Sequence, residues 1–153
     1  MFQVFKEAMR PFPPAPVLSR QAIKKINLGE GHIIPAETSI IISACTAHRD
    51  PRHFPDSENF DPGRFSPQNS VGLHPYSYIP FGLGRRMCVG HVLVTIETKT
   101  ILSTVLRRYR VTEIEGGIEG LAENLKMSFA ISPAKGFRIK SLPRSHPSQM
   151  CVT

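Results

Sequence analysis

One cysteine of the sequence, Cys88, stands where a thiol could do chemistry. It lies at the N-terminal end of a helical pattern, where free backbone N–H groups and the helix dipole favour negative charge. Arg85 and Arg86 precede it, and nearby guanidinium groups favour the thiolate over the thiol. Three glycines flank it, which allows a tight turn and the close approach of a flat ligand. A thiolate held in this way suits a nucleophile or a single soft metal ligand.

The alternative for Cys88 is a buried, inert side chain, which is the commoner role of a lone cysteine. Three cysteines without a Cys-x-x-Cys pair exclude a disulfide framework and a four-cysteine zinc site. We expect Cys45 to be a buried apolar residue and Cys151 to be an exposed thiol of the tail. No zinc-type pair on one helix face is formed by His48, His53, His74 and His91.

Proline and hydrophobic spacing predict the elements around Cys88. A helix is expected over residues 2–10, ended by the proline-rich residues 11–16. Because no N-cap residue precedes it, we expect it to be the end of a helix that starts before Met1. Residues 48–80 read as a long polar loop, which is often functional. Strands are expected over residues 17–28, 32–35, 38–44, 109–111, 125–131 and 136–142.

A second helix is expected over about residues 88–107, directly after the cysteine loop. Apolar side chains recur on one face of it, which predicts a buried stripe. These residues are Val89, Val92, Leu93, Ile96, Ile101 and Val105. Residues 143–153 are expected to form a disordered tail.

Composition indicates a globular chain. Of its 153 residues 41% are hydrophobic and 20% charged, which excludes a disordered chain. The longest apolar tract, residues 38–44, is far shorter than the roughly 20 residues of a membrane span, and no targeting sequence is visible at the start. The sequence alone therefore predicts one small domain with its own core.

Residues 81–90, FGLGRRMCVG, resemble the haem-binding signature of the cytochromes P450, Phe-x-x-Gly-x-Arg-x-Cys-x-Gly, at all five positions. Three further stretches agree in the same order. Glu7 and Arg10 match the Glu-x-x-Arg element of the family's K helix, and the family's meander is matched by residues 48–51, 54–56 and 60–65. The meander departs from the family at Gly63, where glutamate is usual, and at Ser57, where proline is common, but it keeps Arg64.

The resemblance implies a role for each of these residues. Cys88 would be the proximal thiolate ligand of a haem b iron, and so both the metal ligand and the catalytic residue. Arg86 and Arg20 would bind the haem propionates, because guanidinium forks match carboxylates. The other cofactor-binding positions would be Phe81, Gly82 and Gly90. A buried structural triad would be formed by Glu7, Arg10 and Arg64.

The implied fold is part of a cytochrome P450 domain, mainly α with small β-sheets, over residues 1–142. It would comprise the end of the K helix, short strands, the meander, the haem-binding loop, the L helix and a C-terminal β-hairpin. The oxygen-activating helix and the membrane anchor of the family would precede this chain. The implied enzyme is a monooxygenase that inserts one oxygen atom into an apolar substrate. The alternative is a truncated, non-catalytic remnant, because half a pocket cannot exclude water.

Residues 59–80, including HPYSYIP at 74–80, most resemble the microsomal ω-hydroxylases, which points to fatty-acid or other lipid substrates and to the endoplasmic reticulum membrane. Of the net charge of +7, residues 81–153 carry +6. The resemblance puts the basic residues of the segment 85–110 where an NADPH-dependent reductase, an acidic electron donor, docks; a solvated basic face is the alternative. A nucleic-acid-binding module is not expected, because no recognition helix or aromatic platform is visible.

Overall fold

The computed structural model describes residues 1–117, 120, 123–127 and 130–144, which form two compact units. The first unit comprises residues 1–89 with residues 130 and 131. The second comprises the described residues from 90 to 127 and from 132 to 144. The expected tail beyond residue 144, with Cys151, and the expected strand and turn at residues 128 and 129 lie outside the described residues.

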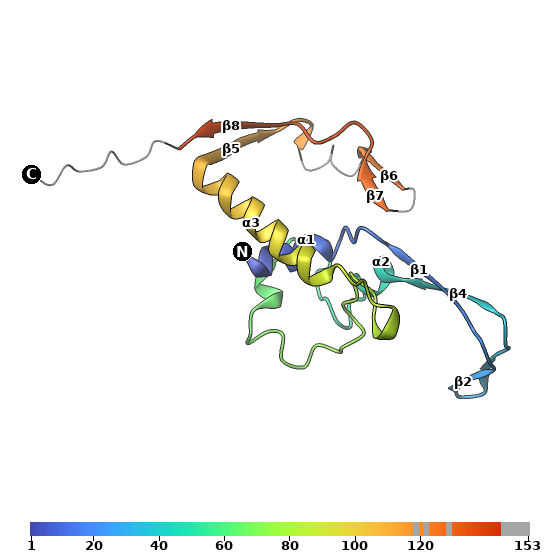
Figure 1. The fold of residues 1–153 in the computed structure, drawn as a ribbon. Coiled ribbons are helices and arrows are strands. Elements are labelled where there is room, and N and C mark those ends of the chain that lie inside the picture. The colour runs from blue at the N-terminus through green and yellow to red at the C-terminus, as the bar shows by residue number, and fades with distance from the viewer. Residues whose placement is uncertain (118–119, 121–122, 128–129, 145–153) are drawn as a thin grey trace, which may run out of the picture. The chain divides into compact units, whose positions relative to one another are not determined.

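Short elements separated by irregular backbone make up the first unit (Figure 1). In chain order they are α1 (Phe2–Met9), β1 (Val17–Gln21), β2 (Ile26–Gly29), β3 (His32–Ile34), β4 (Ser39–Ser43), α2 (Ala44–Ala47) and the 3₁₀ helices η1 (Pro62–Phe65) and η2 (Gly84–Arg86). This order confirms the expected first helix and the expected strands of this region.

Helix α1 buries side chains on more than one face. Phe5 and Met9, four residues apart, are buried, and so are Glu7 and the C-cap residue Arg10, which lie on other sides of the helix. No side chain caps the start of α1, and the prolines that follow Arg10 prevent its continuation. The helix therefore presents an ionic pair, rather than apolar residues alone, to the rest of the unit.

Strands β1 and β4 pair antiparallel, from Val17 opposite Ser43 to Gln21 opposite Ser39. The β2–β3 hairpin continues from the far end of this ribbon (Figure 1). Because strand side chains alternate, Leu18 and Arg20 share one face of β1, and both are half-buried. This face matters for the site below.

Residues 48–80 contain one short helix, η1, as the polar sequence predicts. Aromatic packing supplies the apolar part of this segment: Phe54 and Phe65 are buried, and the rings of Phe65 and Tyr78 lie 4.7 Å apart. Cys45, expected to be buried, is only half-buried, and its Sγ accepts a hydrogen bond at 2.8 Å from Arg49. The prediction for Cys45 is wrong.

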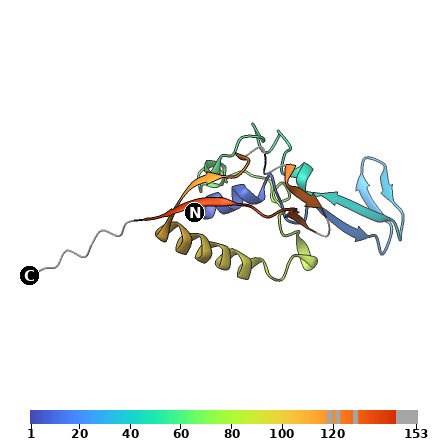
Figure 2. The ribbon, with the colours of Figure 1, turned by 90° about the horizontal axis from the view of Figure 1, so that it is seen from above.

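The second unit contains α3 (His91–Arg108), β5 (Tyr109–Ile114), β6 (Leu125–Met127), β8 (Ile139–Pro143) and most of β7 (Ile131–Pro133). Strand β5 continues directly from the end of α3, and β8 runs beside it (Figure 2). The antiparallel β5–β8 register runs from Tyr109 opposite Pro143 to Ile114 opposite Ile139.

Helix α3 begins at His91, later than expected, because the backbone after Cys88 does not become helical until Gly90 serves as the N-cap. No residue of α3 is buried, and Leu93 is 68% and Ile96 58% exposed. The prediction of a buried stripe is therefore wrong for this chain. An apolar stripe is buried only where another element lies along it, and within its unit α3 packs mainly against β5.

The aromatic packing of the first unit predicts a large effect of Phe54→Ala. Because Phe54 is 2% exposed, this substitution leaves a cavity and should lower the free energy of unfolding by about 3–5 kcal/mol. The matched control is Phe60→Ala, since Phe60 is 56% exposed and should lose less than about 1 kcal/mol. Urea unfolding measures both, and equal losses would contradict this packing.

Candidate functional site

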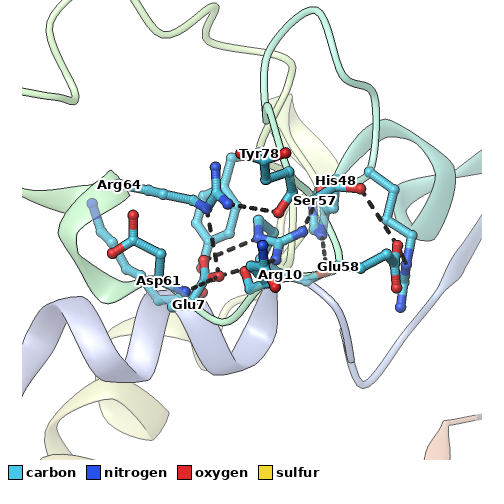
Figure 3. Close-up of polar contacts among 12 residues, drawn as sticks. Glu7, Arg10, His48, Ser57, Glu58, Asp61, Arg64 and Tyr78 are labelled. Carbon is cyan, nitrogen blue, oxygen red and sulfur yellow. Dashed lines mark hydrogen bonds and ion pairs between the residues drawn. The ribbon is translucent and has the colours of Figure 1, made fainter.

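A bidentate ion pair inside α1 is the centre of the polar network in the first unit. Arg10 Nε donates to Glu7 Oε2 and Arg10 Nη2 donates to Glu7 Oε1, both at 3.0 Å (Figure 3). Both side chains are 0% exposed. Because a carboxylate and a guanidinium match in this fork geometry, the pair is among the strong charge-assisted contacts.

The same two residues bind the irregular segment that follows α2. Arg10 Nη1 donates to the carbonyl of His48 at 3.1 Å, and Arg10 Nη2 donates to the carbonyl of Asn59 at 3.4 Å. The backbone N–H of Asp61 donates to Glu7 Oε1 at 3.0 Å. The pair therefore fixes the path of residues 48–61 against the end of α1.

Arg64 approaches the pair but is held mainly by backbone. Its Nε lies 3.7 Å from Glu7 Oε1 and has no hydrogen-bond partner, although it is buried. Its Nη1 and Nη2 donate to the carbonyls of Pro55 and Asp56. The structure thus brings together Glu7, Arg10 and Arg64, with Arg10 forming the tight ionic contact and Arg64 a looser one.

His48, to which the sequence assigned no role, connects this network to the cysteine loop. It is 0% exposed, its Nδ1 lies 3.1 Å from the Arg10 carbonyl, and its Nε2 lies 2.8 Å from the Ile79 nitrogen. The Ile79 N–H can only donate, so Nε2 accepts and Nδ1 carries the proton that is donated to Arg10. No spacing rule identifies such a residue, because its partners are 38 and 31 residues away.

Burial and charge keep the His48 ring neutral. Burial, followed by the positive charges of Arg10 and Arg49, lowers the pKa of His48 from 6.5 to about 4. Tyr78 stacks on the ring with centroids 5.1 Å apart, and its hydroxyl donates to the Lys6 carbonyl at 2.8 Å. Burial also raises the pKa of Tyr78, and the charge of Glu7 adds to this effect. Both rings therefore stay neutral at physiological pH.

The loop that carries Cys88 is closed by backbone hydrogen bonds. The N–H of Gly82 donates to the Ile79 carbonyl at 3.0 Å, and the N–H of Cys88 donates to the Phe81 carbonyl at 2.9 Å. Gly82 and its neighbour Gly84 have φ of +72° and +71°, values that favour glycine. After these two glycines, Arg85, Arg86 and Cys88 lie in an exposed part of the loop.

Strand β1 brings Arg20 to the same loop. A Cβ added to Gly82 would lie 3.7 Å from Leu18 Cδ1 and 3.8 Å from Arg20 Nη2, so the face of β1 with these two residues lies against the loop. Phe81 is half-buried beside Gly82. The first unit thus places a soft sulfur donor, a glycine-lined turn and guanidinium groups in one region, a donor set that fits an iron porphyrin with two carboxylates.

Gly90 and the motif's last turn belong to the second unit, where Gly90 is the N-cap of α3. Among the described residues, no group of three or more His, Cys, Asp or Glu side chains could hold a metal ion. Within the same residues, no helix combines the length and the apolar character that crossing a membrane requires.

Comparison with known proteins gives one consistent result. The family described as Cytochrome P450 matches residues 1–139. Cytochrome P450 4V2 of Mus musculus is 42% identical over 144 residues, which cover 94% of this chain and 26% of that protein. Cytochrome P450 4c3 of Drosophila melanogaster is 38% identical over 141 residues, which cover 91% of this chain and 25% of that protein.

Solved structures agree at the level of the fold. The heme domain of a cytochrome P450DA mutant matches with a TM-score of 0.82 at 24% identity, over 94% of this chain and 30% of that one. Cytochrome P450 CYP102L1 matches with a TM-score of 0.77 at 26% identity, over 93% of this chain and 31% of that one. The expected fold, part of a cytochrome P450 with helices and small β-sheets, is confirmed.

The chain belongs to the cytochrome P450 family. Its relatives include several cytochromes P450 of group 4, and it spans about a quarter of the length of the curated relatives described above.

The buried ion pair predicts that Glu7→Gln is strongly destabilising. The substitution leaves the Arg10 guanidinium buried without its counter-charge, which should lower the free energy of unfolding by about 3–5 kcal/mol. The matched control is Glu113→Gln, which breaks an exposed pair with Lys140 and should change the free energy by less than about 1 kcal/mol. Denaturant unfolding of both variants measures this difference, and a mild effect of Glu7→Gln would contradict it.

The lowered pKa of His48 predicts a loss of stability in acid. The unfolded chain takes up a proton on this ring near pH 6.5, whereas the folded chain does so near pH 4, so stability falls as the pH drops through this range. The expected contribution is up to about 3 kcal/mol. Unfolding measured from pH 7 to pH 4 should show a shallower loss in His48→Gln, and identical slopes would contradict the assignment.

Proposed function

We propose that this chain is the haem-binding portion of a monooxygenase, with the Cys88 thiolate as the proximal ligand of a haem b iron. The observation that carries the proposal is the loop geometry around Cys88. The Cys88 N–H donates a hydrogen bond to the Phe81 carbonyl, Cys88 is exposed, and Arg20 lies beside the same loop. Membership of the cytochrome P450 family supports the same cofactor.

Each loop residue has a physical task in this proposal. Arg86 and Arg20 bind the two propionates, because each guanidinium offers a fork of donors to a carboxylate. Gly82 has a φ of +72°, a backbone conformation that side chains disfavour, and it leaves room for a flat ligand to approach the loop. Phe81 would pack beside the haem and shield the sulfur once the haem is bound, and Gly90 allows the chain to turn into α3.

The haem, when bound through a thiolate, supplies the activation of O₂. One oxygen atom enters the C–H bond of an apolar substrate and the other leaves as water, with two protons and with two electrons from a reductase. Residues 59–80, which resemble the ω-hydroxylases, favour a fatty acid or another lipid as the substrate.

We also propose the electron donor and the location on the same basis. Arg85 and Arg86 are exposed on the loop, where they can attract an acidic, NADPH-dependent reductase by charge. The location proposed for an enzyme of this type is the endoplasmic reticulum membrane.

A non-catalytic remnant is the second candidate. Within the first unit Cys88 is exposed, whereas a haem-thiolate site that activates O₂ must keep water away from its reacting atoms. Titration of the 153-residue chain with haem separates the candidates. Stoichiometric uptake with a cooperative unfolding transition would contradict the remnant.

The thiolate assignment predicts a spectroscopic change. The protein encoded by the longest natural transcript carrying this chain should, when reduced and exposed to CO, show the red-shifted Soret band of a thiolate-ligated haem. Cys88→Ala should abolish this band, because it removes the sulfur donor. The matched control, Cys45→Ala, should keep the band, since Cys45 contacts Arg49 and is not part of the loop. A band that survives in Cys88→Ala would contradict the proposal.

A further inference from the structure

We propose that His48 is a positioning residue for Cys88: its neutral ring joins the end of α1 to the first residue of the turn that sets the position of the sulfur. The inference rests on the proposed function, in which Cys88 is the iron ligand. His48 does not touch the loop cysteine itself and acts through the backbone of Ile79.

The connection from His48 to Cys88 consists of three hydrogen bonds. His48 Nε2 accepts from the Ile79 N–H at 2.8 Å, and the Ile79 carbonyl accepts from the Gly82 N–H at 3.0 Å. The carbonyl of Phe81, one residue earlier than Gly82, accepts from the Cys88 N–H at 2.9 Å. Ile79 is therefore held on both of its peptide groups, and the turn that it starts holds the cysteine.

The other side of the ring is bound to the residues of the buried ion pair. Nδ1 donates to the carbonyl of Arg10, whose guanidinium is bound by Glu7 and in turn donates to the carbonyl of His48 at 3.1 Å. The backbone N–H of His48 donates to the Ala44 carbonyl at 2.9 Å, and Tyr78 stacks on the ring. All four polar atoms of His48 thus have partners.

This geometry requires one protonation state. The neutral ring offers one donor and one acceptor, whereas the imidazolium would direct a second N–H at the Ile79 N–H. The charges of Arg10, at the end of α1, and Arg49, just after α2, disfavour a positive charge on the His48 ring. Tyr78 stacks on the same ring and is in turn affected by the charge of Glu7. Because both ring nitrogens are hydrogen-bonded and the ring is buried, His48 is not placed to exchange protons with solvent.

Two substitutions test the hydrogen bonds of the two ring nitrogens separately. Glutamine has its side-chain oxygen as many bonds from Cα as Nε2, so His48→Gln can still accept from Ile79. Asparagine has its amide nitrogen as many bonds from Cα as Nδ1, so His48→Asn can still donate to Arg10 but loses Ile79. If His48 only fills space, the two variants should behave alike. If it positions the loop, His48→Gln should rescue what His48→Asn loses.

The experiment uses the haem-loaded protein from the longest natural transcript, with His53→Asn as control because His53 lies outside this network. The first readout is the rate at which the ferrous CO complex loses the thiolate Soret band in mild denaturant. The second is deuterium exchange of the peptide covering residues 77–83. We expect both rates to rise about tenfold in His48→Asn, the effect of one lost buried hydrogen bond, and less than threefold in His48→Gln and the control.

Equal changes in the two His48 variants, or no change in His48→Asn, would overturn the proposal. If the wild-type protein lacks the thiolate band, the proposed function fails, while the exchange comparison still decides the role of His48. If neither variant folds, ¹⁵N-histidine NMR of the wild-type protein decides it. A His48 ring with its proton on Nδ1 supports the proposal, and a proton on Nε2 overturns it.

Discussion

The buried carboxylate of Glu7 is the contact on which the first unit depends. Removing a charge from water costs several kcal/mol unless close partners compensate it, and Glu7 has no exposed surface. It is compensated by two bonds from Arg10, one from the Asp61 N–H and the nearby charge of Arg64. Arg10 is the C-cap of α1, Asp61 is the N-cap of η1 and Arg64 lies in η1. The carboxylate therefore has all its hydrogen bonds only when α1 and the irregular segment have reached their final positions.

Guanidinium groups supply donors to backbone carbonyls in residues 48–61, a segment that contains no strand. The hydrogen bond to the His48 carbonyl is buried, whereas those to Pro55 and Asp56 lie at the surface. Arg10 donates to the carbonyls of His48 and Asn59, and Arg64 donates to those of Pro55 and Asp56. The two arginines thereby fix the path of this long loop. His48 connects it to the loop of Cys88, because its ring is hydrogen-bonded to Arg10 on one side and to Ile79 on the other.

The sequence predicted what depends on local spacing and failed where distant partners decide. The first helix, the strands near it and the convergence of Glu7, Arg10 and Arg64 follow from proline, alternation and a known motif. His48 was part of a quoted motif, but its task depends on Ile79, 31 residues away. The stripe of α3 was expected to be buried, because periodicity shows that a face is apolar but not whether another element covers it. The prediction for Cys45 is wrong for a related reason, since the sequence pattern does not reveal its surroundings, which include Arg49.

The long sequence separation of the contacts of α1 also affects how the chain folds during synthesis. Glu7 meets Asp61 after 54 further residues and Lys6 meets Tyr78 after 72. At about 5–20 residues per second, a ribosome needs roughly 3–15 s to add this length. During that interval Glu7 and Arg10 stay hydrated, and the apolar side chains of α1 lack the partners that bury them in the finished unit. The contacts that order the first unit therefore cannot form until most of that unit has been translated.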